Sequence, residues 1–195
     1  MKNLKIFGDS IIKGVTYNGQ SYHLCQEHDF DTLRAQGVTV ENNAKMGATI
    51  DAGLKQLDRK LGTCDGDTTV LFCFGGNDCD FDWAAVARAP SVKHIPKTSL
   101  DAFEKMLVDS IEKIKKRGAM PVVCTTPPIN PQKYFSNVIC TVADGSKVME
   151  FLNGDLTNIS RYHECYNLAI VKCALENNCR LIDLRTPLLL DRKYM

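Results

Sequence analysis

The sequence predicts a three-layer α/β/α domain of the flavodoxin-like type, with a five-stranded parallel sheet in strand order 2-1-3-4-5. Strand and helix patterns alternate along all 195 residues, which is typical of parallel strands joined by crossover helices. The third predicted strand, residues 69–74, is apolar without alternation, as expected of a strand buried on both faces. No linker, repeat or low-complexity tract interrupts the pattern, so we expect residues 1–195 to form one domain.

Five short segments have the apolar or β-branched composition of strands. They are residues 4–8, 38–42, 69–74, 121–125 and 180–184. Helices are predicted over residues 50–61, 98–117 and about 160–177. Gly62 and Gly118 mark the ends of the first two helices. The spacing of Thr98 and Asp101 predicts a capping box at the start of the second helix.

Two segments have no clear pattern. Residues 75–97 form a long irregular stretch after the third strand, and such a length is typical of functional loops. Residues 131–157 are too mixed in composition to assign. In an open parallel sheet the ligand binds beyond the carboxyl ends of the strands. Functional residues are therefore expected directly after the five predicted strands.

Composition and charge exclude several classes of protein. The sequence holds 24 Lys and Arg against 23 Asp and Glu, which lacks the basic excess typical of nucleic-acid binders. The densest basic run, residues 113–117, ends a predicted helix, where cations stabilise the negative end of the helix dipole. No apolar run reaches the roughly 18 residues that a membrane span needs. We therefore expect neither a nucleic-acid partner nor a membrane span.

The cysteines and the amino terminus point to a cytoplasmic protein. The nine cysteines are odd in number and include no Cys-x-x-Cys, so we predict no disulfide framework and no metal site. The chain begins directly with a predicted strand and shows no signal peptide. A secreted protein from which a leader had been removed would look the same. No cofactor is predicted, and the sequence makes no prediction of oligomeric state.

Three short motifs stand at the carboxyl ends of neighbouring predicted strands. Gly8-Asp9-Ser10 follows the first strand, Gly47 follows the second, and Gly75-Gly76-Asn77-Asp78 follows the third. Each motif alone has an ordinary explanation, because Asp and Ser cap helices and Gly, Asn and Asp favour turns. A helix beginning at Ser10 would also direct backbone N–H groups toward an oxyanion. Since the three strand ends share one edge of the sheet, the motifs are expected to meet.

Taken together, these motifs resemble the SGNH hydrolases, also called GDSL esterases. The resemblance follows the order of strands and motifs over nearly the whole chain, and the Gly-x-Asn-Asp motif is its most specific part. It implies that Ser10 is the nucleophile of an ester hydrolase. It also implies an oxyanion hole made by the Ser10 and Gly47 N–H groups and the Asn77 side chain.

Further residues near these motifs are weaker candidates for contacts with the substrate. Asp9, Asp78, Trp83 and His94 are candidate substrate-binding residues, and Phe81, Trp83, Tyr134 and Phe135 are candidate pocket walls. Aromatic residues after strands are more often plain packing residues than ligand contacts. These assignments remain secondary to the three motifs.

The catalytic base is the element that the sequence does not supply. The family places an Asp-x-x-His after the fifth strand, and these 195 residues contain none. The histidines are His23, His28, His94 and His163, and none has sequence support as the base. We expect the chain to stop before the Asp-x-x-His segment; the alternative is that the base has been lost. In either case the chain as given is expected to be a poor catalyst, because losing a triad member costs roughly 10⁴- to 10⁶-fold in turnover.

The resemblance implies small acyl esters as substrates, with acetyl groups on carbohydrate or short lipid esters as candidates. Two other functions remain open. A protein with this fold and a degenerate site could bind an ester or glycan without turnover. A flavodoxin-like nucleotide-binding or regulatory domain is the other alternative, and the missing phosphate-binding loop argues against it.

Overall fold

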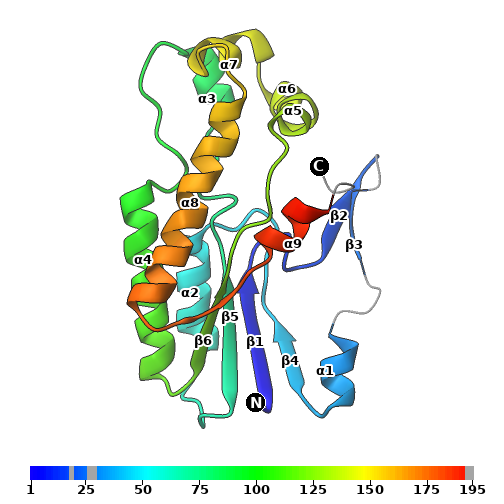
Figure 1. The fold of residues 1–195 in the computed structure, drawn as a ribbon, viewed down its shortest axis with the longest axis vertical. Coiled ribbons are helices and arrows are strands. Elements are labelled where there is room, and N and C mark those ends of the chain that lie inside the picture. Colours follow the sequence, from blue (N-terminus) through cyan, green and yellow to red (C-terminus); the bar gives the residue numbers. More distant parts are fainter. Residues whose placement is uncertain (18–19, 26–29, 192–195) are drawn as a thin grey trace.

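The computed structural model describes residues 1–17, 20–25 and 30–191. Its main sheet is parallel and five-stranded, in the order β4-β1-β5-β6-β7, which confirms the predicted strand order (Figure 1). The strands are β1 Asn3–Gly8, β4 Thr39–Asn42, β5 Thr68–Cys73, β6 Met120–Cys124 and β7 Arg180–Ile182. Strand β5 is buried at every position, as its unbroken apolar run predicts.

One face of the sheet is covered by three long helices, α2 Ile50–Lys60, α4 Leu100–Lys116 and α8 Thr157–Glu176 (Figure 1). The other face carries much shorter elements, α1 Asp31–Ala35 and α9 Arg185–Leu190. An antiparallel hairpin, β2 Val15–Tyr17 and β3 Tyr22–Leu24, follows β1. The protein is therefore three-layered, with one thick and one thin helical layer.

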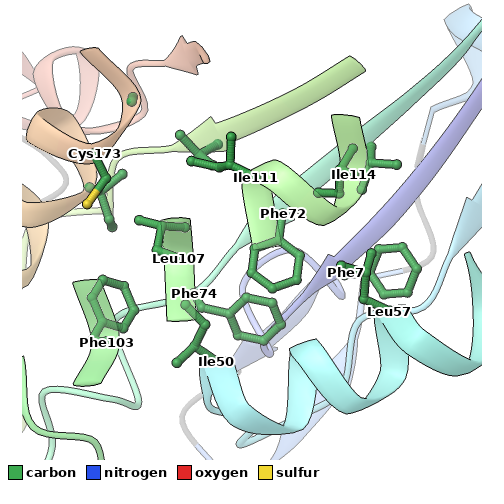
Figure 2. Packing of buried hydrophobic residues seen from close by; sticks show 14 of the residues in the cluster. Phe7, Ile50, Leu57, Phe72, Phe74, Phe103, Leu107, Ile111, Ile114 and Cys173 are labelled. Atoms are coloured by element: carbon green, nitrogen blue, oxygen red, sulfur yellow. The ribbon is translucent and has the colours of Figure 1, made fainter. Parts of the chain in front are cut away.

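Alternate residues of the central strands fill two separate cores. Phe7 and Phe72 point to the side of the long helices, where they pack with Leu57, Ile111 and Ile114 (Figure 2). The second core, on the face of the short helices, takes the intervening strand residues. Its buried members are Leu4, Ile6, Val38, Leu71, Cys73, Val122 and Cys124.

A third hydrophobic cluster lies beyond the carboxyl ends of the strands (Figure 1). It takes residues from α3 Trp83–Arg88, α5 Pro131–Tyr134, the π-helix Phe135–Ile139 and α7 Gly145–Phe151, and α6 Cys140–Val142 lies between the last two. We call α3 together with residues 129–156 the cap. Buried cap residues such as Ile139, Val148 and Leu152 pack against one another and against Ile159 of α8. The cap thus stands over the edge of the sheet at which the sequence motifs end.

The structure corrects two local predictions. Ser10 does not begin a helix, because residues 10–14 form turns that lead into the β2–β3 hairpin. Thr98 and Asp101 do not form a capping box: Ser99 is the N-cap of α4, without a side-chain cap bond. Thr98 Oγ1 donates instead to Asp78 Oδ1 at 2.6 Å, because a buried carboxylate is the stronger acceptor. In the described ranges, no helix combines the length and apolar character that crossing a bilayer requires.

The contact between α2 and Phe74, the residue after β5, depends on a glycine. A methyl group at Gly53 would lie 2.2 Å from Cζ of Phe74, and the Phe74 ring is itself packed on Phe72 at a centroid distance of 4.7 Å. We predict that Gly53→Ala destabilises the protein by about 1 kcal/mol or more. Overpacking, which costs about 1–3 kcal/mol, outweighs the gain of about 1 kcal/mol in helix propensity. Urea unfolding at pH 7 measures this change.

Gly62→Ala is the matched control. Gly62 follows the same helix, and an added methyl group there would meet nothing within 4 Å. Its unfolding midpoint should match or exceed that of the unmodified chain. Equal stability of the Gly53 and Gly62 variants would contradict the close-packing account.

Candidate active site

A cavity of about 270 Å³ opens between the carboxyl edge of the sheet and the cap. Ser10 and Asn77 both line it, as the sequence predicts for residues at neighbouring strand ends. Aromatic side chains from the loop after β5, from the cap and from α8 form much of the remaining wall. They are Phe81, Trp83, Tyr134 and Tyr162. The cavity is therefore a largely apolar pocket with a hydroxyl and an amide at its sheet end.

Ser10 is presented by a turn that Asp9 holds in place. The Ile11 N–H donates to Asp9 Oδ1 at 2.9 Å, and the Lys13 N–H donates to the Asp9 carbonyl at 3.0 Å. Asp9 is buried, and this burial raises the pKa of its carboxyl group. No group in the described residues forms a hydrogen bond with the Ser10 hydroxyl or with the Ser10 N–H. The turn thus exposes the predicted nucleophile to the cavity.

Asn77 joins the ends of three strands. Its Nδ2 donates to the Ala48 carbonyl at 3.1 Å and lies 3.5 Å from Asp9 Oδ2. These contacts connect the loop after β5 to the turn after β1 and to the loop after β4. The amide is therefore oriented by the same segments that carry Ser10 and Gly47.

Gly47 lies in a tight turn over residues 45–48, which the Ala48 N–H closes by donating to the Lys45 carbonyl at 3.2 Å. Its φ of +71° explains the glycine, since this conformation is strained for other residues. The Gly47 N–H has no hydrogen-bond partner in the described residues. Gly47 is not among the residues that line the cavity, but it is the neighbour of Ala48, which Asn77 contacts.

Asp78, predicted as a substrate contact, is instead a completely buried structural residue. Its carboxylate accepts from the Ile50 N–H at 3.0 Å, from the Gly75 N–H at 3.0 Å and from the Thr98 hydroxyl at 2.6 Å. Burial raises the pKa of Asp78, and the three donors oppose that effect. The prediction was wrong because the carboxylate points into the protein, where it joins three segments, and does not line the cavity.

Trp83 lines the cavity, and its polar edge is already paired. Trp83 Nε1 donates to Asp80 Oδ1 at 2.6 Å, and Lys97 Nζ lies 2.8 Å from Asp80 Oδ2. Burial raises the pKa of the Tyr134 hydroxyl, and the negative charge of Asp80 adds to that effect. These polar groups therefore satisfy one another and leave aromatic faces for a ligand.

Two other predicted contacts lie away from the cavity. His94 Nε2 lies 2.9 Å from the Ala89 carbonyl, and its ring packs edge-on against Phe151 of the cap. Phe135 is partly buried in the cap cluster. Neither residue lines the cavity. Both were misplaced because the sequence did not predict the cap, against which His94 and Phe135 pack.

His163 is a residue near Ser10 to which the sequence patterns gave no support as the base. It lies on α8, lines the same cavity as Ser10, and is 7 % exposed. Burial, helped by the Arg185 cation, lowers the pKa of His163 to about 4, so its imidazole is neutral at pH 7. The sequence could have indicated that His163 is buried, because it falls on the buried stripe of α8 with Ile159, Tyr166 and Ile170.

The other histidines offer no alternative within the described residues. His23 Nε2 lies 3.0 Å from Thr16 Oγ1 across the exposed hairpin. His28 lies outside the described residues. No cluster of three or more His, Cys, Asp or Glu that could hold a metal ion occurs in residues 1–17, 20–25 and 30–191. Among the histidines of the described residues, His163 is therefore the one that lines the cavity with Ser10 and Asn77.

The parallel sheet, its covering helices and a serine at the end of the first strand define a flavodoxin-like α/β protein with a hydrolase-type site. The family model of the GDSL-like lipases and acylhydrolases matches residues 6–194. The chain belongs to this family of ester hydrolases. No curated protein matches it.

Solved structures share this fold. A lipase/acylhydrolase from Enterococcus faecalis has a TM-score of 0.59 at 17 % identity, over 100 % of this chain and 82 % of its own. An acetyl xylan esterase has a TM-score of 0.59 at 22 % identity, over 95 % and 78 %. The esterase EstA from a Pseudoalteromonas species has a TM-score of 0.56 at 16 % identity, over 98 % and 80 %.

We predict that Asp78→Ala destabilises the protein by about 3 kcal/mol or more, because each buried donor left unpaired costs about 1–3 kcal/mol. Urea unfolding measures the loss. Asp109→Ala is the control, since Asp109 is an exposed acid on α4, and its replacement should change stability by less than about 0.5 kcal/mol. A small effect of Asp78→Ala, comparable to that of the control, would contradict the role given to this carboxylate.

The low pKa of His163 predicts how stability depends on pH. Between the ordinary value of 6.5 and the folded value of about 4, the unfolded chain binds a proton that the folded chain does not. Stability is therefore lost as the pH falls through this range, by about 3 kcal/mol in total from this residue. Urea unfolding at several pH values should show the stability of the wild type falling relative to that of His163→Phe. Parallel curves for the two proteins would rule out a buried neutral imidazole.

Proposed function

We propose that the protein hydrolyses small acyl esters through an acyl-enzyme on Ser10. The observation that carries the proposal is that Ser10 and Asn77 line one cavity at the carboxyl edge of the sheet, with no described residue bonded to the Ser10 hydroxyl. Ser10 Oγ would attack the ester carbonyl, and its proton would pass to a base. The alcohol would then leave, and water would release the acid from Ser10.

The developing oxyanion needs donors that no protein group already uses. Within the described residues, the Ser10 and Gly47 N–H groups have no hydrogen-bond partner. The Asn77 amide is held beside Gly47 through its bond to the Ala48 carbonyl. These features support the oxyanion hole that the family resemblance implies.

The base is the part that the described residues do not supply. None of His23, His94 and His163 forms a hydrogen bond with the Ser10 hydroxyl, and the sequence has no Asp-x-x-His. His163 lines the cavity, but a pKa of about 4 makes it a weak general base near neutral pH. We therefore expect slow hydrolysis by the 195-residue chain.

The cavity favours a compact substrate with an apolar surface. Its volume of about 270 Å³ and its aromatic walls suit a short acyl ester of a ring-shaped alcohol. Acetylated carbohydrate is such a substrate, because the apolar faces of sugar rings pack on aromatic side chains. Two of the structures that share the fold are described as an acetyl xylan esterase and an acetyl-xylooligosaccharide esterase. The proposed substrate class is therefore acetyl esters of sugars.

A second candidate is a binding protein that holds the same ligand without turnover. It is favoured by one observation, the lack of a histidine hydrogen-bonded to Ser10 in the described residues. The two candidates differ in whether Ser10 reacts.

Imidazole rescue separates the two candidates. A histidine that is missing from a site can be replaced in part by free imidazole, which then takes the Ser10 proton. Hydrolysis of p-nitrophenyl acetate by the wild type should therefore rise with imidazole concentration above the rate measured with Ser10→Ala. The Ser10→Ala reaction accounts for hydrolysis by imidazole in solution.

Two further variants sharpen the measurement. Asn77→Ala should lower the Ser10-dependent rate by about 10²- to 10³-fold, as expected for one lost oxyanion donor. Ser91→Ala is the control, because Ser91 is exposed and bonds to Glu150 away from the cavity. A wild-type rate equal to that of Ser10→Ala at every imidazole concentration would reject hydrolysis and leave the binding function.

A further inference from the structure

Two buried polar atoms in the described part of the chain have no hydrogen-bond partner. They are Nδ1 of His163 and Oγ1 of Thr126. Both residues line a second cavity of about 30 Å³, which shares Asp9 and Gly76 with the larger cavity. A buried polar atom without a hydrogen-bond partner costs about 1–3 kcal/mol of folding free energy. Two such atoms beside one small cavity therefore need a physical explanation.

A hydrogen bond connects the backbone of Thr126 to α8, the helix that carries His163. Thr126 follows β6, and its N–H donates to Asn167 Oδ1 at 3.2 Å. Asn167 lies on α8 one turn after His163, so both side chains point to the same side of the helix. Thr126 and His163, whose unpaired atoms need partners, thus border the same small cavity.

The other ring nitrogen of His163 behaves differently. Nε2 has no hydrogen bond in the described residues, yet it is not among the fully buried atoms. It therefore keeps accessible surface, and His163 is buried except where it lines the cavities. If the Thr126 hydroxyl donates to Nδ1, the imidazole proton must lie on Nε2, because neutral histidine carries one N–H.

Neighbouring donors in the cavity wall are not free in this way. Trp83 Nε1 is paired with Asp80, and Asn77 Nδ2 with the Ala48 carbonyl. The remaining wall near them is aromatic or aliphatic, including Phe81 and Ile129. An Nε2–H on His163 would thus be a hydrogen-bond donor in a cavity whose wall is mainly apolar.

We propose that His163 is a substrate-binding residue: held at Nδ1 by the Thr126 hydroxyl, it donates from Nε2 to the ring oxygen of the cyclic alcohol part of the ester, which fills the aromatic cavity. Thr126 is then a positioning residue. The proposal rests on the proposed function for the place of the substrate. The hydrogen bond from His163 would favour substrates whose alcohol is an oxygen-containing ring over those whose alcohol is a purely hydrocarbon ring.

The first experiment reads the tautomer directly, without turnover. Nitrogen-15 NMR of the imidazole should show His163 neutral at pH 7 with its proton on Nε2. Thr126→Val should change this signature to a mixture of tautomers, and Thr126→Ser should restore it. A proton on Nδ1 in the wild type, or a spectrum insensitive to Thr126→Val, would overturn the proposal.

The second experiment uses two alcohols that differ in one ring atom, tetrahydropyran-4-ol and cyclohexanol. At concentrations at which each shifts the Trp83 indole resonance, the former should also shift His163 Nε2 and the latter should not. Equal effects of the two alcohols at Nε2 would overturn the role of the ring oxygen. Because no reaction is needed, this result stands apart from any failure of the esterase assay.

The third experiment uses the acetate esters of the same alcohols, with imidazole present. The wild type should prefer the tetrahydropyranyl ester in kcat/KM relative to the cyclohexyl ester, chiefly through KM. His163→Phe should reduce this ratio by about tenfold, as expected for one hydrogen bond between uncharged groups. His163→Gln should keep it within about threefold, because the glutamine amide can donate from near the Nε2 position.

The outcomes of the third experiment are distinct. A ratio unchanged in His163→Phe would contradict substrate binding by His163. No Ser10-dependent turnover of either ester would reject the proposed function, while the NMR results would still decide the role of His163.

Discussion

The site depends on the buried carboxylate of Asp78. It accepts hydrogen bonds from the first N–H of α2, from the turn after β5 and from the segment before α4. Those segments are far apart in sequence, and no side chain of their own caps the starts of α2 and α4. A buried carboxylate costs free energy unless several donors surround it. The Asp78 carboxylate therefore connects the loop that contains Gly47 to the loop that contains Asn77.

The active edge of the sheet is consequently rigid although it is made of loops. Asn77 contacts Ala48 and Asp9, so the ends of β1, β4 and β5 are joined by side-chain bonds as well as by the sheet. On the far side, the Thr125 hydroxyl bonds to Asp183 and accepts from the Leu184 N–H, which fixes β7 to β6. Such bracing is what a preorganised oxyanion site needs, because donors that must reorient during reaction stabilise the transition state less.

The strand pattern and strand-end motifs predicted the sheet order and the meeting of Ser10 with Asn77. They could not predict the role of Asp78. An Asn-Asp pair after a strand gives the same sequence pattern whether the Asp carboxylate faces the cavity or the core. The cap escaped prediction for another reason. Its helices are short, and residues such as Ile139 and Val148 are buried against one another and not against the sheet. His163 was predictable in part, since it is a polar residue on the inward stripe of a crossover helix near its amino-terminal end.

The central claim is that Ser10 is a nucleophile presented to the cavity. The most direct measurement is intact-mass analysis after reaction with an alkyl fluorophosphonate in the presence of imidazole, followed by peptide mapping. We expect a single adduct on the peptide that contains Ser10, forming more slowly in Asn77→Ala because the phosphonyl oxygen loses a donor. An adduct at another residue, or none at reagent concentrations that modify a known serine esterase, would contradict the account.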